Sequence, residues 1–105
     1  MARLKDKRVK LTLYFKTLTP NVYFQPPASQ KLIYPAIIFN RDDWEGSWAN
    51  NKLYLNTDSY GILVIDDDPD ETIATQILEE LSGTSLNRRY VSDNLYHVRL
   101  VHTTM

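Results

Sequence analysis

The chain of 105 residues contains no cysteine and only three glycines. Without cysteine it can form no disulfide bond, no thiolate nucleophile and no zinc site with cysteine ligands. With so few glycines it has no glycine-rich loop of the kind that cradles a phosphate. Its longest apolar runs, such as residues 36–39, fall far short of the roughly 18 residues that a membrane span needs. These absences exclude several classes of enzyme and predict no contact with a membrane.

The overall composition is ordinary, with 43% hydrophobic and 24% charged residues. These values are typical of a globular protein rather than of a disordered tail or a fibrous repeat. A chain of this length buries about 60–70% of its extended surface, which is enough for one hydrophobic core. We therefore expect a single domain over residues 1–105.

The first 18 residues fit two kinds of secondary structure. Leu4, Leu11 and Phe15 recur at the spacing of a helix face. Val9, Leu11 and Leu13 alternate with polar residues, as they would in a strand. Periodicity alone does not decide between the two.

Several later segments are rich in β-branched and aromatic residues or alternate in polarity, which favours strands. We expect strands at residues 22–24, 33–40, 54–66, 86–91 and 95–103. The polar stretch between the second and third of these has neither a helical nor a strand period, and we interpret it as a connection.

A second helix is predicted after the third long strand. Asp68 is placed to be its N-cap, Pro69 suits the first helical position, and Glu71 fits a capping box. Gly83 is suited to end it in a left-handed conformation, and its apolar stripe is Ile73, Ile77, Leu78 and Leu81. The order of elements predicts an α+β domain, with an antiparallel or mixed sheet of about four to five strands and two helices packed on one face.

A search for catalytic or metal-binding patterns gives weak candidates only. The acidic run 66–71 lacks the turn glycine and the bidentate glutamate of a calcium loop, so a capped helix start explains it better. His97 and His102 are separated by an odd number of positions on one expected strand, so we expect them to point to opposite faces. The adjacent carboxylates of Asp42 and Asp43 diverge in direction. We expect no catalytic residue, no metal site and no cofactor, and therefore no enzyme.

Aromatic residues are numerous, and seven of the twelve are tyrosines, which are enriched where protein surfaces meet. Phe15, Phe24 and Phe39 are best explained as core residues. Trp44 and Trp48 fall in the polar connection instead. Either that connection packs onto its own sheet, or the two tryptophans take part in an interface.

The charges are strongly segregated along the chain, although the net charge is only −1. Residues 42–80 carry 11 acidic side chains against one basic, Lys52, and six bases fall within the first 16 residues. A solvated helix face is the ordinary explanation for those six. A chain-wide asymmetry also favours pairing of unlike patches between copies or with a partner, and head-to-tail contacts of that kind can close into rings.

Five strings, in order, resemble a family of small tailed-bacteriophage proteins, the tail terminator or tail completion proteins of the head-to-tail region. The strings are Asn21–Pro27, Lys31–Phe39, Ala49–Tyr54, Val64–Asp70 and Arg88–His97. Together they span most of the chain. The resemblance also favours a helix for Arg3 to Leu18.

The resemblance implies a structural virion protein that forms a hexameric ring at the head-proximal end of the tail, within a virion assembled in the host cytoplasm. Such a ring ends growth of the tail tube and joins the tail to the head connector. Its partners would be other copies of itself, the tail tube protein and a connector or neck protein, while DNA passes through the lumen without specific binding. An adjacent neck or adaptor ring is one alternative. A small DNA-binding module that uses the basic N-terminal segment is another.

The candidate contact residues lie in the long polar connection and near the last hairpin. They are Asp42, Asp43, Trp44, Trp48, Asn50, Asn51, Lys52, Tyr54, Arg88, Arg89, Tyr90, Asn94 and His97.

Overall fold

The computed structural model describes residues 2–41, 48–49, 52–53 and 58–104. The elements run in the order α1 (Ala2–Lys16), β1 (Val22–Phe24), β2 (Ala36–Arg41), β3 (Trp48–Ala49), β4 (Lys52–Leu53), β5 (Asp58–Asp66), α2 (Thr72–Glu80), β6 (Thr84–Ser92) and β7 (Leu95–Thr104). Five strands form one sheet in the order β1-β2-β5-β7-β6. The β1–β2 pair is parallel and the other three pairs are antiparallel.

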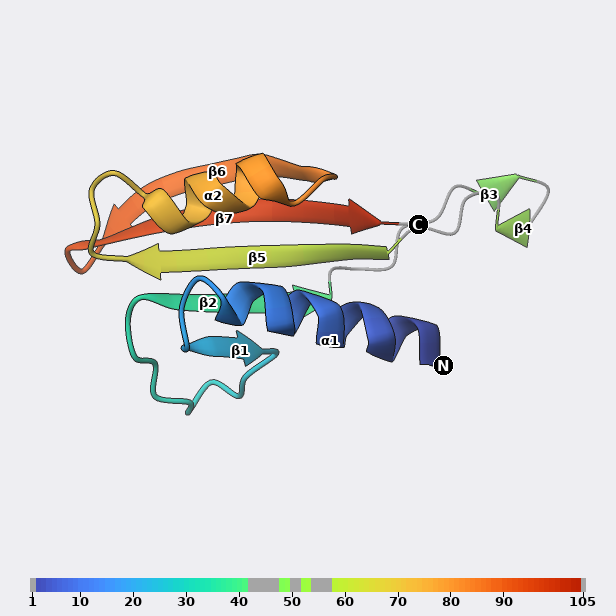
Figure 1. The fold of residues 1–105 in the computed structure, drawn as a ribbon, viewed down its shortest axis with the longest axis horizontal. Coiled ribbons are helices and arrows are strands. Elements are labelled where there is room, and N and C mark those ends of the chain that lie inside the picture. The colour runs from blue at the N-terminus through green and yellow to red at the C-terminus, as the bar shows by residue number, and fades with distance from the viewer. Residues whose placement is uncertain (1, 42–47, 50–51, 54–57, 105) are drawn as a thin grey trace.

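Both helices lie on the same face of this sheet, with α1 over the β1 and β2 side and α2 over the β7 and β6 side (Figure 1). The protein is therefore an α+β domain with a five-stranded mixed sheet and two helices, which confirms the expected fold class. No described helix covers the second face of the sheet, which we call the open face. None of the helices in the described part of the chain is long and apolar enough to cross a membrane.

The hydrophobic core lies between the helices and the sheet. Ile62 at the centre of β5 pairs with Phe39 on one side and Leu100 on the other, and all three are fully buried. The Phe15 ring of α1 meets Phe39 edge-on, with 5.1 Å between ring centroids. Phe24 packs against this cluster and is partly buried. The expectation that the three phenylalanines belong to the core is confirmed.

The ambiguous first segment is a helix. Leu11 and Phe15, one turn apart, bury their side chains against the sheet, whereas Leu13 remains 63% exposed, which a helix face explains and an alternating strand does not. The helix ends two residues earlier than the resemblance implies. Behind it, the Thr19 hydroxyl and the Asn21 amide both donate to the carbonyl of Pro35 and so fix the start of β2.

The start of α2 differs from the prediction. Asp68 is not the N-cap, because the helix begins at Thr72 and Glu71 occupies the cap position in a left-handed conformation, with φ of 53°. Residues 68–71 form a turn instead, in which the Glu71 amide donates to the Asp68 carbonyl. Asp68 still serves the helix, since its carboxylate accepts from the Thr72 hydroxyl at 2.7 Å and from the Asp70 amide at 2.9 Å. Proline and aspartate favour a turn as readily as a first helical turn, and here the turn prevails.

Gly83 connects α2 to β6 and has the left-handed conformation expected of it, with φ of +84°. The helix itself ends at Glu80, so Gly83 lies beyond the cap. A Cβ at this position would lie 2.6 Å from the carbonyl oxygen of Thr103, and the Gly83 carbonyl accepts from the Thr103 amide. Glycine is therefore required both by its backbone conformation and by close approach of β7.

The last two strands form the predicted hairpin and extend slightly further than expected. Asp93 and Asn94 make a two-residue turn with φ of 53° and 61°, which suits the right-handed twist of the strands. A register irregularity between Leu86 and Arg88 leaves Asn87 without a partner in the ladder.

The remaining predicted elements are partly described. The third long strand is β5, which begins at Asp58, and residues 54–57 lie outside the described part. The segment interpreted as a connection contains one short strand, β3, which pairs with β4 in a separate two-stranded sheet. Strands of two residues are too short to show a period, so the sequence pattern did not reveal them.

Candidate interaction surfaces

About half of the predicted contact residues lie outside the described part of the chain. These are Asp42, Asp43, Trp44, Asn50, Asn51 and Tyr54. Trp48 pairs with Leu53, and Lys52 with Ala49, in the β3–β4 hairpin. The contact roles predicted for these residues remain predictions.

The structure brings three predicted residues together on the open face of β6 and β7. Val98 and Leu100 of β7 face the core, so the residues that alternate with them, His97 and Arg99, face the other way. Tyr90 pairs with His97 across the strands, and their rings stack with 4.7 Å between centroids. The Arg88 guanidinium lies 5.0 Å from the Tyr90 ring centroid. This stack presents positive charge and flat rings to solvent.

Arg89 does not join this stack, although it lies next to Arg88 and Tyr90 in sequence. Successive strand residues point to opposite faces, so Arg89 points toward the helices. There it forms an ion pair with Glu71, which fastens β6 to the start of α2. Asn94 lies in the left-handed position of the hairpin turn. The structure thus divides one predicted contact cluster into an open-face stack, a structural ion pair and a turn residue.

A polar pair joins the two helices. The Tyr14 hydroxyl of α1 donates to a carboxylate oxygen of Glu80 of α2 at 2.8 Å. Loss of hydration raises the pKa of Tyr14 well above its ordinary value, and the hydrogen bond to the negative Glu80 adds to that increase. The Tyr14 hydroxyl therefore stays protonated, and able to donate, near neutral pH.

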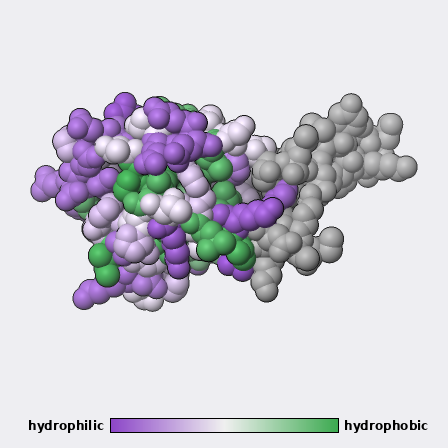
Figure 2. Space-filling model, in the orientation of Figure 1, coloured by the Kyte–Doolittle hydropathy of each residue, from purple (hydrophilic) through white to green (hydrophobic). Residues whose placement is uncertain are grey.

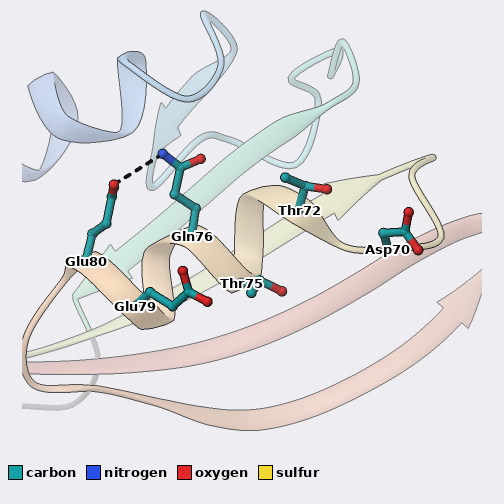
Figure 3. A pocket seen from close by; sticks show the side chains of 6 residues that line it. All are labelled: Asp70, Thr72, Thr75, Gln76, Glu79 and Glu80. Atoms are coloured by element: carbon teal, nitrogen blue, oxygen red, sulfur yellow. Dashed lines mark hydrogen bonds between the residues drawn. The ribbon is translucent and has the colours of Figure 1, made fainter.

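The solvent side of α2 is acidic and polar (Figure 3). Glu79 and Glu80 lie near its end, Asp70 lies just before its start, and the helix carries no basic residue. The Gln76 amide donates to Glu80 at 3.3 Å. A shallow depression over this side is lined by Asp70, Thr72, Thr75, Gln76, Glu79 and Glu80.

The solvent side of α1 is basic. Its described charged side chains are Lys7, Arg8, Lys10 and Lys16, and Arg8 lies over the Phe24 ring of β1 at 5.3 Å. Because α1 and α2 lie side by side in one layer, that layer has a basic half over β1 and β2 and an acidic half over β7 and β6 (Figure 1). The two helices therefore keep the segregation of charge seen along the sequence, whereas Arg88 and Arg89 place positive charge on β6 beside the acidic helix.

Large hydrophobic side chains are exposed at the two lateral sides of the sheet. On the α1 and β1 side they are Val9, Leu13, Ile33 and Tyr34, and on the β6 side Leu86, Tyr90 and Val91. On the helix-bearing face, hydrophobic patches interrupt a largely hydrophilic surface (Figure 2). Of these seven, only Tyr90 was a sequence candidate. Val9 and Leu13 lie on the side of α1 opposite the core residues Leu11 and Phe15, so the first segment had to be known as a helix before they could be found.

Two titratable side chains, His102 of β7 and Asp66 of β5, are buried. His102 is 7% exposed and contacts the Thr84 hydroxyl through Nδ1 at 3.0 Å. Burial, and then the positive charge of Lys7, lower its pKa. Asp66 is also buried and accepts from the Asp68 amide at 3.1 Å, and burial is the main cause that raises its pKa. The opposite orientations predicted for His97 and His102 are confirmed.

Among the described residues, no group of three or more histidine, aspartate or glutamate side chains is arranged to hold a metal ion. The acidic run 66–71 is instead occupied by turn and cap hydrogen bonds. Comparisons of the chain with protein-family models, with curated proteins and with solved structures gave no match.

Proposed function

We propose that this chain is a structural virion protein that assembles with copies of itself into a ring at the head-proximal end of a phage tail. The resemblance of its ordered strings to tail terminator proteins supports this role. The proposed ring ends growth of the tail tube and joins the tail to the connector. It needs no cofactor and carries out no chemical reaction.

The observation that carries the proposal is the distribution of charge and exposed apolar surface. The basic helix and the acidic helix lie at opposite lateral sides of one layer, and the exposed large hydrophobic residues occur at the same two sides. A monomer gains little from such an arrangement. Unlike patches at opposite sides of one molecule favour heterologous contacts, which close into a ring when the rotation per subunit allows.

The proposed mechanism of termination is geometric. A ring that matches the last ring of the tube on one face, and lacks the stacking surface on its other face, stops further addition of tube subunits. That second face is then free to bind a connector or neck protein. The lumen passes DNA without base-specific contacts.

The test is polymerisation of purified tail tube protein with and without this chain, followed by negative-stain microscopy and native mass spectrometry. We expect rings of the chain, alone or on tubes, and tubes that are shorter and bear a ring at one end. An unrelated small basic protein at the same concentration is the control for charge effects. Tubes of unchanged length, together with a chain that is monomeric under both conditions, would contradict the proposal.

The basic solvent side of α1 favours a second candidate, a module that binds duplex DNA. Binding through phosphates would weaken steeply with salt. Reversing the charge of Lys5, Lys7, Arg8 and Lys10 together would abolish it, whereas Lys31→Glu, in the loop before β2, serves as the control. Salt-sensitive DNA binding by a chain that forms no rings would favour this candidate over the first.

A further inference from the structure

We propose that the exposed side of α1 docks into the groove between α2 and β6 of a second copy of the chain, so that copies join head to tail. The inference rests on the self-assembly in the proposed function and names the two surfaces that meet. We call them the α1 stripe and the α2–β6 groove.

The α1 stripe consists of Val9, Leu13 and Lys16. These residues are spaced by four and three positions, so they lie on one side of the helix. Val9 is 37% exposed and Leu13 is 63% exposed. The core-facing side of α1 is taken by Leu11 and Phe15. The stripe is thus an apolar surface with a positive charge at one end that nothing in the described chain covers.

The α2–β6 groove lies at the other lateral side of the molecule. Its apolar lining is Ala74, Leu78, Leu86 and Val98, and its acidic rim is Asp70 and Glu71. Leu86 is 48% exposed, although it lies on the helix-facing side of β6, opposite Leu100. In the described part of the chain no strand lies beyond β6, so the outer edge of the sheet is open along this groove.

The two surfaces are complementary in both apolar character and charge. Arg89 lines the groove as well, but it is paired with Glu71. This leaves Asp70 at the rim before the start of α2, while Glu79 lies near the end of α2 on its solvent side (Figure 3). Leu13 of one copy against Leu86 of the next would bury apolar area, and it would bring Lys16 toward these carboxylates.

Symmetric contacts are less favourable than this head-to-tail contact. Two α1 helices face to face would oppose bases with bases, and two α2 helices would oppose acids with acids. Two β6 strands paired antiparallel about the strand centre would set Arg88 of one copy directly against Arg88 of the other, which destabilises a strand pair. The stripe and the groove lie over opposite lateral halves of the same sheet face, so the stripe of one copy cannot dock into that copy's own groove.

The experiment uses two single variants of the full chain and their mixture, measured by native mass spectrometry and sedimentation velocity. Leu13→Glu disrupts the stripe and leaves the groove intact, whereas Leu86→Glu disrupts the groove and leaves the stripe intact; the two introduced carboxylates repel each other, so the mixture cannot restore the altered contact. We expect each variant alone to be monomeric at concentrations where the unaltered chain forms larger assemblies. The mixture should form one-to-one dimers, because one stripe and one groove remain functional, and should form nothing larger.

Controls separate docking from folding. Ser29→Glu introduces the same charge at an exposed position in the loop before β2, outside both surfaces, so it should assemble like the unaltered chain. Lys16→Glu is a second stripe variant that keeps the apolar residues, and it should weaken assembly as well. Circular dichroism and thermal unfolding should show native-like transitions for every variant.

Three results would overturn the inference: an unaltered chain that is monomeric at every concentration, variants that assemble as it does, or a mixture that remains monomeric. Rings that form as described but leave tail tubes unaffected would keep the inference and reject the proposed function. Tubes that are shortened by each single variant added on its own would reject the inference and keep the proposed function.

Discussion

His102 is the buried side chain with the clearest dependence on solution conditions. It lies on the helix-facing side of β7, within hydrogen-bond distance of Thr84 and beneath the Lys7 end of α1. Burial and the charge of Lys7 both disfavour its protonated form and lower its pKa. The neutral ring is therefore part of the folded state.

Because the pKa of His102 is lower in the folded chain, the unfolded chain binds more protons between the folded pKa and the ordinary value of about 6.5. The contribution of His102 to stability is complete above pH 6.5 and is lost as the pH falls. We expect the free energy of unfolding, measured with urea at pH 7, 6 and 5, to decrease over this range. His102→Gln should flatten the dependence, and Ser82→Ala, which changes no titratable group at an exposed position, should leave it as it is. Parallel pH curves for the unaltered chain and His102→Gln would contradict this.

Some single-residue roles follow from sequence because they depend on local chemistry alone. Gly83 and the Asp93–Asn94 turn are examples, since few residue types accept positive φ. The pairing of Arg89 with Glu71 was not predictable. It depends on the distance between a strand and a helix start that are separated by 18 positions in the chain.

At the scale of elements, the junction between α2 and β6 is tightly constrained. Gly83 takes up a left-handed conformation directly beneath the carbonyl of Thr103. This contact sets where β6 leaves the helix and where it meets β7. The junction thus fixes the register of the hairpin from the end opposite its turn.

Gly83→Ala should lower the free energy of unfolding by at least about 1–2 kcal/mol, which is the cost of a left-handed backbone for a residue with a Cβ. Displacement of the Thr103 carbonyl would add to that cost. Urea or thermal unfolding measures the effect. Ser82→Ala, at the neighbouring exposed position, should change stability little. A Gly83→Ala variant as stable as the parent would show that β7 moves freely at this point.

Most elements could be predicted because their local patterns are clear, as the run of isoleucine, leucine and valine in β5 and the apolar stripe of α2 show. The boundaries were less certain. Asp68 and Pro69 suit both a turn and a helix start, and only the surrounding fold selects between them. The α1 segment needed more than its own pattern, because Leu11 and Phe15 also fit an alternating strand.

At the scale of the whole molecule, the near-neutral net charge conceals a layer of two helices of opposite charge, the basic α1 and the acidic α2. The contact candidates that sequence provided, such as Trp44 and Arg88, included no residue of the α1 stripe and only Arg89 of the α2–β6 groove. Those surfaces are created by the strand order, which places α1 and α2 at opposite sides. Strand order depends on long-range pairing that local patterns do not encode.

Assembly between the basic α1 side of one copy and the acidic α2 side of the next should weaken as the salt concentration rises. A few exposed ion pairs, at about 0.5 kcal/mol each, amount to roughly a tenfold change in the association constant when they are screened. We expect sedimentation velocity to show that loss between low salt and 0.5 M NaCl. Lys16→Glu should reduce the dependence. Association that is unaffected by salt would indicate that apolar contacts alone hold the copies together.

The position of β7 has a consequence for biosynthesis. This strand follows all the other described strands in sequence, yet it lies inside the sheet, between β5 and β6. The central pairing of β5 with β7 therefore cannot form until residues up to 104 have left the ribosome. Before that moment β5 presents an unpaired edge rich in isoleucine, leucine and valine. The five-stranded sheet is therefore completed only after β7 has been synthesised, and until then chaperones or a neighbouring nascent chain can bind that edge of β5.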